Sequence, residues 1–133
     1  MRIFIDTSAF YALLDRDDEN HQKAKRAWTG MLHSENTLVT SNYVLVETFA
    51  LLLHRLGIDA LRGFQDAIVP LVNVEFVSSE MHRSSVSALL SASRRNLSLV
   101  DCVSFEVMRT LEIKTVFVFD LHFEEQGFMI IPQ

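Results

Sequence analysis

Four acidic residues stand at positions from which an α/β fold would bring them to one edge of its sheet: Asp6, Glu47, Asp101 and Asp120. The first follows directly after the apolar run 2–5, and the last ends the apolar run 115–119. The carboxyl ends of parallel strands form the edge at which such folds bind ligands. Carboxylates about 4 Å apart repel by on the order of 4 kcal/mol, so a cluster needs a counter-ion. All-oxygen ligation favours Mg²⁺ or Mn²⁺ over zinc.

Each of these acids also has an explanation that needs no metal. Asp6-Thr7-Ser8 after a strand suits a helix N-cap, and Ser98-Leu99-Val100-Asp101 matches a capping box. Asp120, which closes a strand, could be a turn residue. Glu47 could reach the surface near a helix start, where the helix dipole favours negative charge. These alternatives stay open for each residue, but capping does not require all four acids together, and the set favours a metal site.

The helix predicted for residues 43–56 carries Glu47 among neighbours that are nearly all apolar, including Val44, Val46 and Leu52. A helix that is apolar on almost every side is expected to be largely buried. An ionised glutamate there is unfavourable without a cation or strong hydrogen-bond donors. Unless the leucines at 51–53 all belong to the core, this helix has surplus apolar surface, which predicts an interface with a second copy of the chain.

Other kinds of catalytic site find little support in the sequence. The five histidines lack the short spacing of a zinc-binding helix, and only His122 lies near a candidate acid. His122 is therefore a secondary candidate for a catalytic role. The chain has no glycine-rich phosphate loop and no nucleophile elbow. Cys102, the single cysteine, is predicted to be a small buried side chain.

Length and composition predict one compact domain that spans residues 1–133. Hydrophobic residues make up 49% of the chain, yet no segment has the roughly 18 uninterrupted apolar residues of a membrane helix. The lone cysteine excludes an internal disulfide and fits a reducing cytoplasm. A net charge of −5 argues against strong nonspecific binding to duplex nucleic acid, but not against a nuclease.

Apolar periodicity predicts strands that alternate with helices along the chain. The expected strands cover residues 2–5, 37–40, 74–77, 114–119 and 128–131. The expected helices cover residues 9–14, 21–32, 43–56, 59–68, 78–92 and 99–111. Such alternation implies parallel pairing with helices on both faces of the sheet. The predicted fold class is α/β, a three-layer α/β/α sandwich with a central, mainly parallel sheet.

The ordered set of motifs resembles the PIN domain family, and within it the VapC-type toxins of prokaryotic toxin–antitoxin pairs. The resemblance covers essentially the whole chain and rests on Asp6-Thr7-Ser8, Val46-Glu47-Thr48, Ser98–Phe105, and Asp120–Phe123 followed by Gly127-Phe128. One departure is Val118, two residues before the fourth acid, where the family often has Ser or Thr. This departure removes a possible hydroxyl near the site and predicts a less efficient enzyme.

The resemblance implies a PIN-like fold and an endoribonuclease that uses Mg²⁺ or Mn²⁺ to hydrolyse RNA phosphodiester bonds. The four acids would serve as both the metal ligands and the catalytic residues. An RNA substrate, a protein antitoxin and a second copy of the chain would be the partners. Arg94, Arg95 and Lys114 are candidates for gripping RNA, although a solvated surface charge is the simpler explanation of each.

Two other functions remain open from the sequence. One is a PIN nuclease that processes RNA without being a toxin. The other is a PIN-fold binding module with little catalytic activity, which the presence of all four acids speaks against.

Overall fold

Residues 1–133, which the computed structural model describes throughout, contain five parallel strands in one sheet. The strands are β1 (Arg2–Ile5), β2 (Thr37–Ser41), β3 (Asn73–Glu75), β4 (Thr115–Phe117) and β5 (Met129–Ile131). Their order is β3-β2-β1-β4-β5, so β1 is central. Phe4 of β1 lies opposite Val39 of β2 and Val116 of β4. Because all neighbouring pairs are parallel, all five strands end at the same edge.

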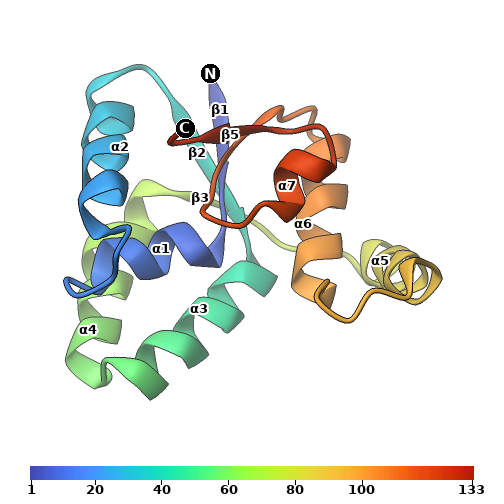
Figure 1. Ribbon diagram of the computed structural model, residues 1–133, viewed down its shortest axis with the longest axis horizontal. Coiled ribbons are helices and arrows are strands. Elements are labelled where there is room, and N and C mark those ends of the chain that lie inside the picture. The colour runs from blue at the N-terminus through green and yellow to red at the C-terminus, as the bar shows by residue number, and fades with distance from the viewer.

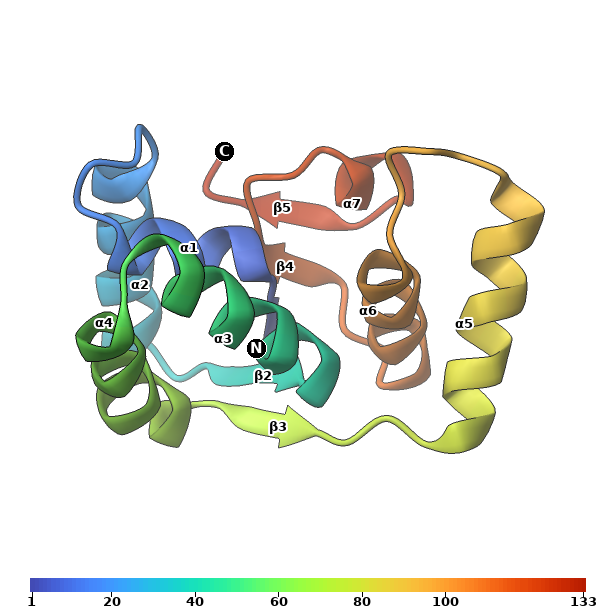
Figure 2. The ribbon, with the colours of Figure 1, turned by 90° about the horizontal axis from the view of Figure 1, so that it is seen from below.

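Seven α-helices accompany the sheet: α1 (Thr7–Leu14), α2 (His21–His33), α3 (Asn42–Arg55), α4 (Ile58–Gly63), α5 (Ser79–Ala92), α6 (Leu99–Thr110) and α7 (His122–Glu125). Figures 1 and 2 show α1, α2 and α4 on one side of the sheet and α5 and α6 on the other. α3 packs against both α1 and α6. The predicted three-layer α/β/α sandwich is confirmed, with a sheet that is parallel throughout. None of the helices has the length and apolar character needed to span a membrane.

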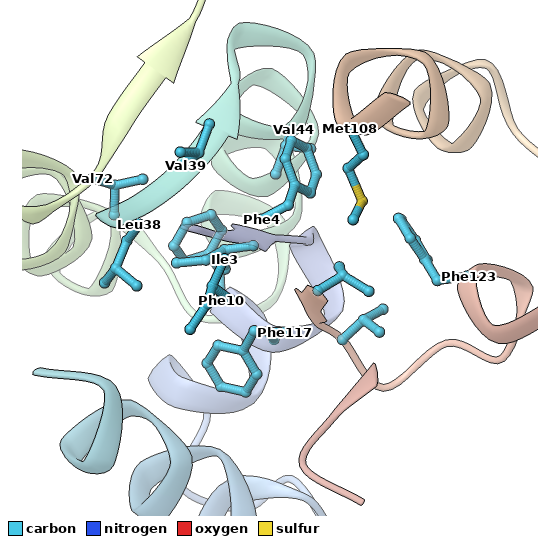
Figure 3. Close-up of a cluster of buried hydrophobic side chains, with 14 of the residues drawn as sticks. Ile3, Phe4, Phe10, Leu38, Val39, Val44, Val72, Met108, Phe117 and Phe123 are labelled. Carbon is cyan, nitrogen blue, oxygen red and sulfur yellow. The ribbon is translucent and has the colours of Figure 1, made fainter. Parts of the chain in front are cut away.

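The core lies on both faces of β1. Ile3, Phe4 and Ile5 are almost completely buried. Figure 3 shows side chains from both helical layers around this strand, such as Phe10 of α1 and Met108 of α6. Each such buried side chain contributes about 1.5–3 kcal/mol. The core therefore fixes the C-terminal end of β1, where the first candidate acid follows.

Three segments differ from the prediction. α7 was not predicted, because four residues are too few to show helical periodicity. The strand expected over 114–119 ends at Phe117. The helix expected over 59–68 ends as α4 at Gly63, and a π-helical turn (Phe64–Ile68) and a 3-10 turn (Val69–Leu71) follow. The second turn contains Pro70, which has no N–H to continue an α-helix.

α3 is not buried on almost every side, which corrects the prediction from its sequence. Only Val44, Thr48 and Leu52 are fully buried, while Val46 is 70% exposed and Leu53 is 50% exposed. The helix packs against α1, α4 and α6, and these neighbours leave Val46 and Leu53 exposed. The leucines at 51–53 are therefore not all core residues.

Candidate active site

All four predicted acids line one cavity of about 360 Å³ at the C-terminal edge of the sheet. The topology explains this convergence. Asp6 follows β1, Asp120 follows the neighbouring strand β4, and the Asp6 N–H donates to the Phe117 carbonyl at 3.1 Å. Asp101 lies in the first turn of α6, and Glu47 lies in the N-terminal half of α3. The structure thus brings together every acid that the sequence singled out.

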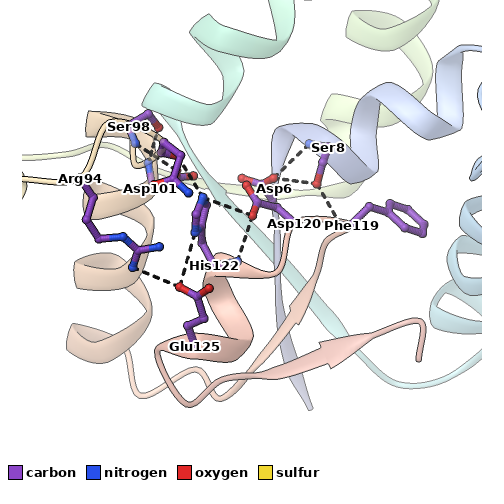
Figure 4. A network of polar contacts seen from close by, with 10 residues as sticks. Asp6, Ser8, Arg94, Ser98, Asp101, Phe119, Asp120, His122 and Glu125 are labelled. Carbon is purple, nitrogen blue, oxygen red and sulfur yellow. Dashed lines mark hydrogen bonds and ion pairs between the residues drawn. The ribbon is translucent and has the colours of Figure 1, made fainter.

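The turn that starts α1 holds Asp6 in place. Its Oδ2 accepts hydrogen bonds from the Ser8 N–H at 3.1 Å and from the Ser8 hydroxyl at 2.8 Å (Figure 4). Ser8 Oγ in turn accepts the Phe119 N–H at 3.0 Å, so one hydroxyl joins the chain segments that follow β1 and β4. Asp6 is the N-cap of α1, as the sequence allowed, and it also lines the cavity.

The charged form of Asp6 is electrostatically unfavourable. Burial raises the pKa of its carboxyl from 3.8 to about 7, and the negative charges of Asp101 and Glu47 add to this rise. The hydrogen bonds from Ser8 lower the pKa but do not cancel the effect of burial. A cation close to Asp6 would therefore stabilise the ionised form of this carboxyl at neutral pH.

A capping box at the start of α6 fixes Asp101. The Asp101 N–H donates to Ser98 Oγ and the Ser98 N–H donates to Asp101 Oδ2, both at 3.1 Å. Burial raises the pKa of the Asp101 carboxyl, and the charge of Asp120 adds to this. Its other oxygen, Oδ1, accepts no hydrogen bond from the chain. The capping residue predicted from the sequence thus keeps one oxygen for a ligand.

His122 lies beside Asp120 and belongs to the site more closely than the sequence indicated. Its main-chain N–H donates to Asp120 Oδ1 at 2.9 Å, so Asp120 is also the turn residue that the sequence allowed. The ring Nε2–H donates to the Asn96 carbonyl at 2.9 Å. Ligand atoms of Asp101, Asp120 and His122 lie within 4.8 Å of one another, but an Nε2 that donates its proton to Asn96 has no lone pair left for a metal ion. The sequence signal that pointed to His122 was its position two residues after Asp120.

Glu47 is half-buried, and the contact between α1 and α3 sets its position. Thr48 Oγ1 donates to Thr7 Oγ1 at 3.1 Å, and both threonines are buried. Because Thr48 follows Glu47 and Thr7 follows Asp6, this hydrogen bond fixes the two acids relative to each other along the main chain. Glu47 completes the cavity without belonging to the close group around His122.

Comparison with known proteins identifies the family. The PIN domain family matches residues 3–129. The chain is 35% identical to the 23S rRNA-specific endonuclease VapC20 of Mycobacterium tuberculosis, over 96% of this chain and 95% of the relative. The chain belongs to the PIN domain family. Within it, the chain is a VapC-type ribonuclease, and the interpretation drawn from its four motifs is confirmed.

Solved structures show the same PIN fold. The crystal structure of Mycobacterium tuberculosis VapC20, described as a sarcin–ricin loop cleaving toxin, matches with a TM-score of 0.86 over 96% of each chain. VapBC2 of Rickettsia felis, bound to a DNA fragment from its promoter, matches with a TM-score of 0.72 at 10% identity over 98% of this chain and 97% of that one. FitAcB of Neisseria gonorrhoeae matches with a TM-score of 0.68 at 12% identity, over 98% of this chain and 96% of that one. The last two likenesses concern the fold alone.

The cavity of this PIN domain suits a divalent cation. Its four carboxylates supply the oxygen ligands that Mg²⁺ and Mn²⁺ prefer. No lysine or arginine lines the cavity to balance them. Burial raises the pKa values of Asp6 and Asp101, and the charges of the neighbouring acids add to this rise, so a cation would stabilise the ionised cluster. The donor set and the electrostatics therefore both fit a bound metal ion.

Only two of the three basic residues proposed to grip RNA lie near this cavity. Arg94 and Arg95 stand between α5 and α6, next to the Asn96 carbonyl that contacts His122. Figure 4 shows Arg94 paired with Glu125, at 3.1 Å. Lys114 directly precedes β4 and thus lies at the opposite edge of the sheet, so its assignment to the site is wrong.

Val118 is a core residue, 1% exposed, on the segment after β4. The hydroxyl that supports this end of the sheet comes instead from Ser8, which accepts the Phe119 N–H. The effect of Val118 on catalytic efficiency stays a prediction.

Proposed function

We propose that residues 1–133 act as one nuclease domain, an endoribonuclease dependent on Mg²⁺ or Mn²⁺, with Asp6, Glu47, Asp101 and Asp120 as metal ligands and catalytic residues. The observation that carries this proposal is the single cavity that all four acids line. The raised pKa of Asp6 supports it, because a buried carboxylate of this kind is stabilised by a nearby cation.

A bound divalent ion would lower the pKa of a water molecule and stabilise the charge that develops on the phosphate. The chain's own residues provide the positioning. Ser8 orients the Asp6 carboxylate, and Ser98 orients Asp101, so that each presents an oxygen to the cavity. A carboxylate that is not bound to metal can accept the proton of the attacking water. Glu47 and Asp120, which are half-buried, have the freedom to take this part.

The substrate that we infer is an exposed loop of structured RNA, with the sarcin–ricin loop of 23S rRNA as the first candidate. The relative that is 35% identical over 96% of this chain is a 23S rRNA-specific endonuclease. The net charge of −5 disfavours a broad duplex-binding surface. Sequence-specific recognition of RNA usually targets unpaired bases in loops. We assign the phosphates that flank such a loop to Arg94 and Arg95, which lie in the segment between α5 and α6.

The cavity should be tested with purified protein and a hairpin RNA that carries this loop. Cleavage should require Mg²⁺ or Mn²⁺ and stop with EDTA. Asp101→Asn should abolish cleavage and keep the fold, because it removes one ligand charge. Asp66→Asn, which changes an exposed acid in the π-helical turn, serves as the matched control and should cleave normally. Full activity of Asp101→Asn would contradict the proposed site.

We further propose that the chain is a toxin that works in the cytoplasm and is silenced by a protein antitoxin. A basic side chain of the antitoxin, above all Arg, would suit the four acids because guanidinium pairs with carboxylates in a bidentate way. Expression of the chain alone should arrest growth, and Glu47→Gln or Asp120→Asn should relieve the arrest at equal protein level. Harmless expression of an enzyme that still cuts RNA would replace the toxin role with RNA processing.

The chain is also proposed to form a homodimer, through α5 and not through the leucines at 51–53 of α3, of which only Leu53 is exposed. Only Ser85 is fully buried in the 14 residues of α5, and Leu90 on this helix is 70% exposed. Figure 2 shows α5 at the periphery, where it packs mainly against α6. Leu90→Lys should therefore convert a dimer into a monomer in sedimentation experiments. Ile58→Lys on α4 is the matched control, because Ile58 is also exposed but lies in the other helical layer.

A further inference from the structure

A hollow of about 250 Å³ lies between α3 and α6, directly beside the acid cavity. We propose that it is a subsite for one unpaired nucleobase, from a nucleotide next to the phosphodiester that the enzyme cleaves. This inference rests on the proposed ribonuclease function and adds to it a determinant of substrate choice.

The hollow is continuous with the acid cavity through one side chain. Glu47 lines both, and Val100 of the hollow directly precedes Asp101 of the cavity. A phosphate bound at the acids, with its charge balanced by a cation, therefore places a neighbouring nucleotide within reach of the hollow. The hollow extends the active site and is not a separate surface.

The lining has the chemistry of a base-stacking site. Tyr43, Val46 and Val100 make most of its surface apolar, and no lysine or arginine takes part, so a phosphate does not fit there. The Tyr43 hydroxyl is hydrogen-bonded to the His82 ring of α5, which holds the aromatic ring in one orientation. Unpaired RNA bases commonly stack on such rigid aromatic and apolar side chains.

One polar group at the rim can read the edge of a base. Asn42 Oδ1 accepts the Val77 N–H at 2.9 Å, which fixes the amide group. Its NH₂ group has no acceptor among the residues of the chain. An aromatic ring that enters the hollow would thus meet apolar faces and a fixed pair of N–H donors. A nucleobase offers both an apolar face and acceptor atoms along its edge, whereas an aliphatic side chain offers only the apolar surface.

The size of the hollow fits this ligand. Pockets for drug-sized molecules measure roughly 300–1,000 Å³, so a hollow of about 250 Å³ suits a single ring system. Val46, which forms part of the lining, is 70% exposed, so its apolar surface is free to contact a base. A base that is flipped out of a loop supplies a partner of this size.

The test is a double-mutant cycle between enzyme and RNA. The substrate is the hairpin RNA with its cleavage position mapped, made also with an abasic ribonucleotide on either side of the cleaved bond. For the wild type, removal of the base at one of the two positions should lower kcat/KM by about tenfold. Val46→Ser and Tyr43→Ala should lower kcat/KM on intact RNA to a similar extent. On the abasic RNA these variants should cause no further loss.

Leu53→Ser is the matched control, because Leu53 is an exposed apolar residue of the same helix outside the hollow. It should keep the wild-type response to base removal. If the loss caused by Val46→Ser or Tyr43→Ala instead multiplies with the loss caused by base removal, the subsite would be overturned. The ribonuclease proposal would still stand. Multiplying losses together with a change from dimer to monomer would assign the hollow to a subunit contact instead. No cleavage by the wild type with Mg²⁺ or Mn²⁺ would overturn both proposals.

Discussion

Two pairs of acids share the cavity: the buried pair Asp6 and Asp101, and the half-buried pair Glu47 and Asp120. The buried pair lies at the N-termini of α1 and α6, where Ser8 and Ser98 hold the carboxylates by hydrogen bonds. In the half-buried pair, Asp120 accepts one main-chain hydrogen bond and Glu47 accepts none. The cluster therefore combines a fixed half with an adaptable half.

In the proposed metal-dependent nuclease, this difference would separate two tasks. Burial raises the pKa of both carboxyls in the buried pair, so a bound cation would stabilise the ionised form of this half. Its hydrogen bonds also set the direction of the ligand atoms before substrate binds, which is what electrostatic preorganisation requires. The half-buried pair can adjust to the RNA and to the attacking water. The comparison predicts unequal effects when the two pairs are mutated.

The largest expected effect concerns the buried pair. Asp6→Asn and Asp101→Asn should each lower kcat/KM by about a thousandfold, because metal stabilisation of the transition state is worth several kcal/mol. Glu47→Gln and Asp120→Asn should lower it by about ten- to a hundredfold. Cleavage of the hairpin RNA at saturating Mn²⁺ measures these four values. Equal losses for all four variants would remove the distinction between the fixed and the adaptable half.

The next prediction concerns stability against pH. The pKa of Asp6 rises from 3.8 to about 7 on folding, so within this window the folded chain keeps a proton that the unfolded chain releases. The free energy of unfolding of the metal-free protein should therefore fall as pH rises from about 4 to about 7, by on the order of 4 kcal/mol from Asp6 alone. Urea unfolding in EDTA measures this decline.

Two controls sharpen that measurement. Asp6→Asn should flatten the decline and make the metal-free protein more stable than wild type above about pH 7, although we expect the variant to lose most of its activity. Saturating Mg²⁺ or Mn²⁺ should also flatten it for the wild type, because a cation binds the ionised carboxylate. If the metal-free wild type instead became more stable over this window, the electrostatic account of the buried pair would be wrong.

A smaller effect is expected for His122, which connects the half-buried pair to the segment before α6. Its ring donates to the Asn96 carbonyl, and its main-chain N–H donates to Asp120. His122→Ala keeps the second contact and removes the first, so kcat/KM should fall by about tenfold as Asn96 and the adjoining Arg95 lose their anchor. His33→Ala, an exposed histidine at the end of α2, is the control and should retain full activity. An unchanged kcat/KM for His122→Ala would show that the segment before α6 plays no part in catalysis.

The buried pair was also the part of the site that could best be predicted from sequence. Asp6 directly follows a short apolar strand, and Asp101 completes a capping box, so local rules place both residues at helix N-termini. Parallel pairing then brings these helix starts to one edge. For these two residues, the local sequence pattern that predicts the helix start therefore also predicts the position in the fold.

The half-buried pair and its surroundings were harder to predict. The apolar composition of α3 indicated full burial, but composition does not show how many neighbours a helix has, and Val46 is largely exposed. α7 is a single turn without periodicity, so the contact of its first residue, His122, with Asn96 did not follow from the sequence. Lys114 was assigned to the wrong edge of the sheet. It is close to Asp120 in sequence, but β4 lies between the two residues and separates them in space.

The smallest expected effect compares two serine N-caps. Ser98 caps α6 by accepting the Asp101 N–H, and Ser78 caps α5 by accepting the Met81 N–H, both at 3.1 Å. Ser98→Ala and Ser78→Ala should each lower the free energy of unfolding by about 1 kcal/mol. Only Ser98→Ala should also lower kcat/KM, by about threefold to tenfold, because loss of the hydroxyl that accepts the Asp101 N–H loosens the helix turn that carries this carboxylate. Paired unfolding and cleavage measurements separate the two roles, and equal activity of both variants would show that the cap does not orient Asp101.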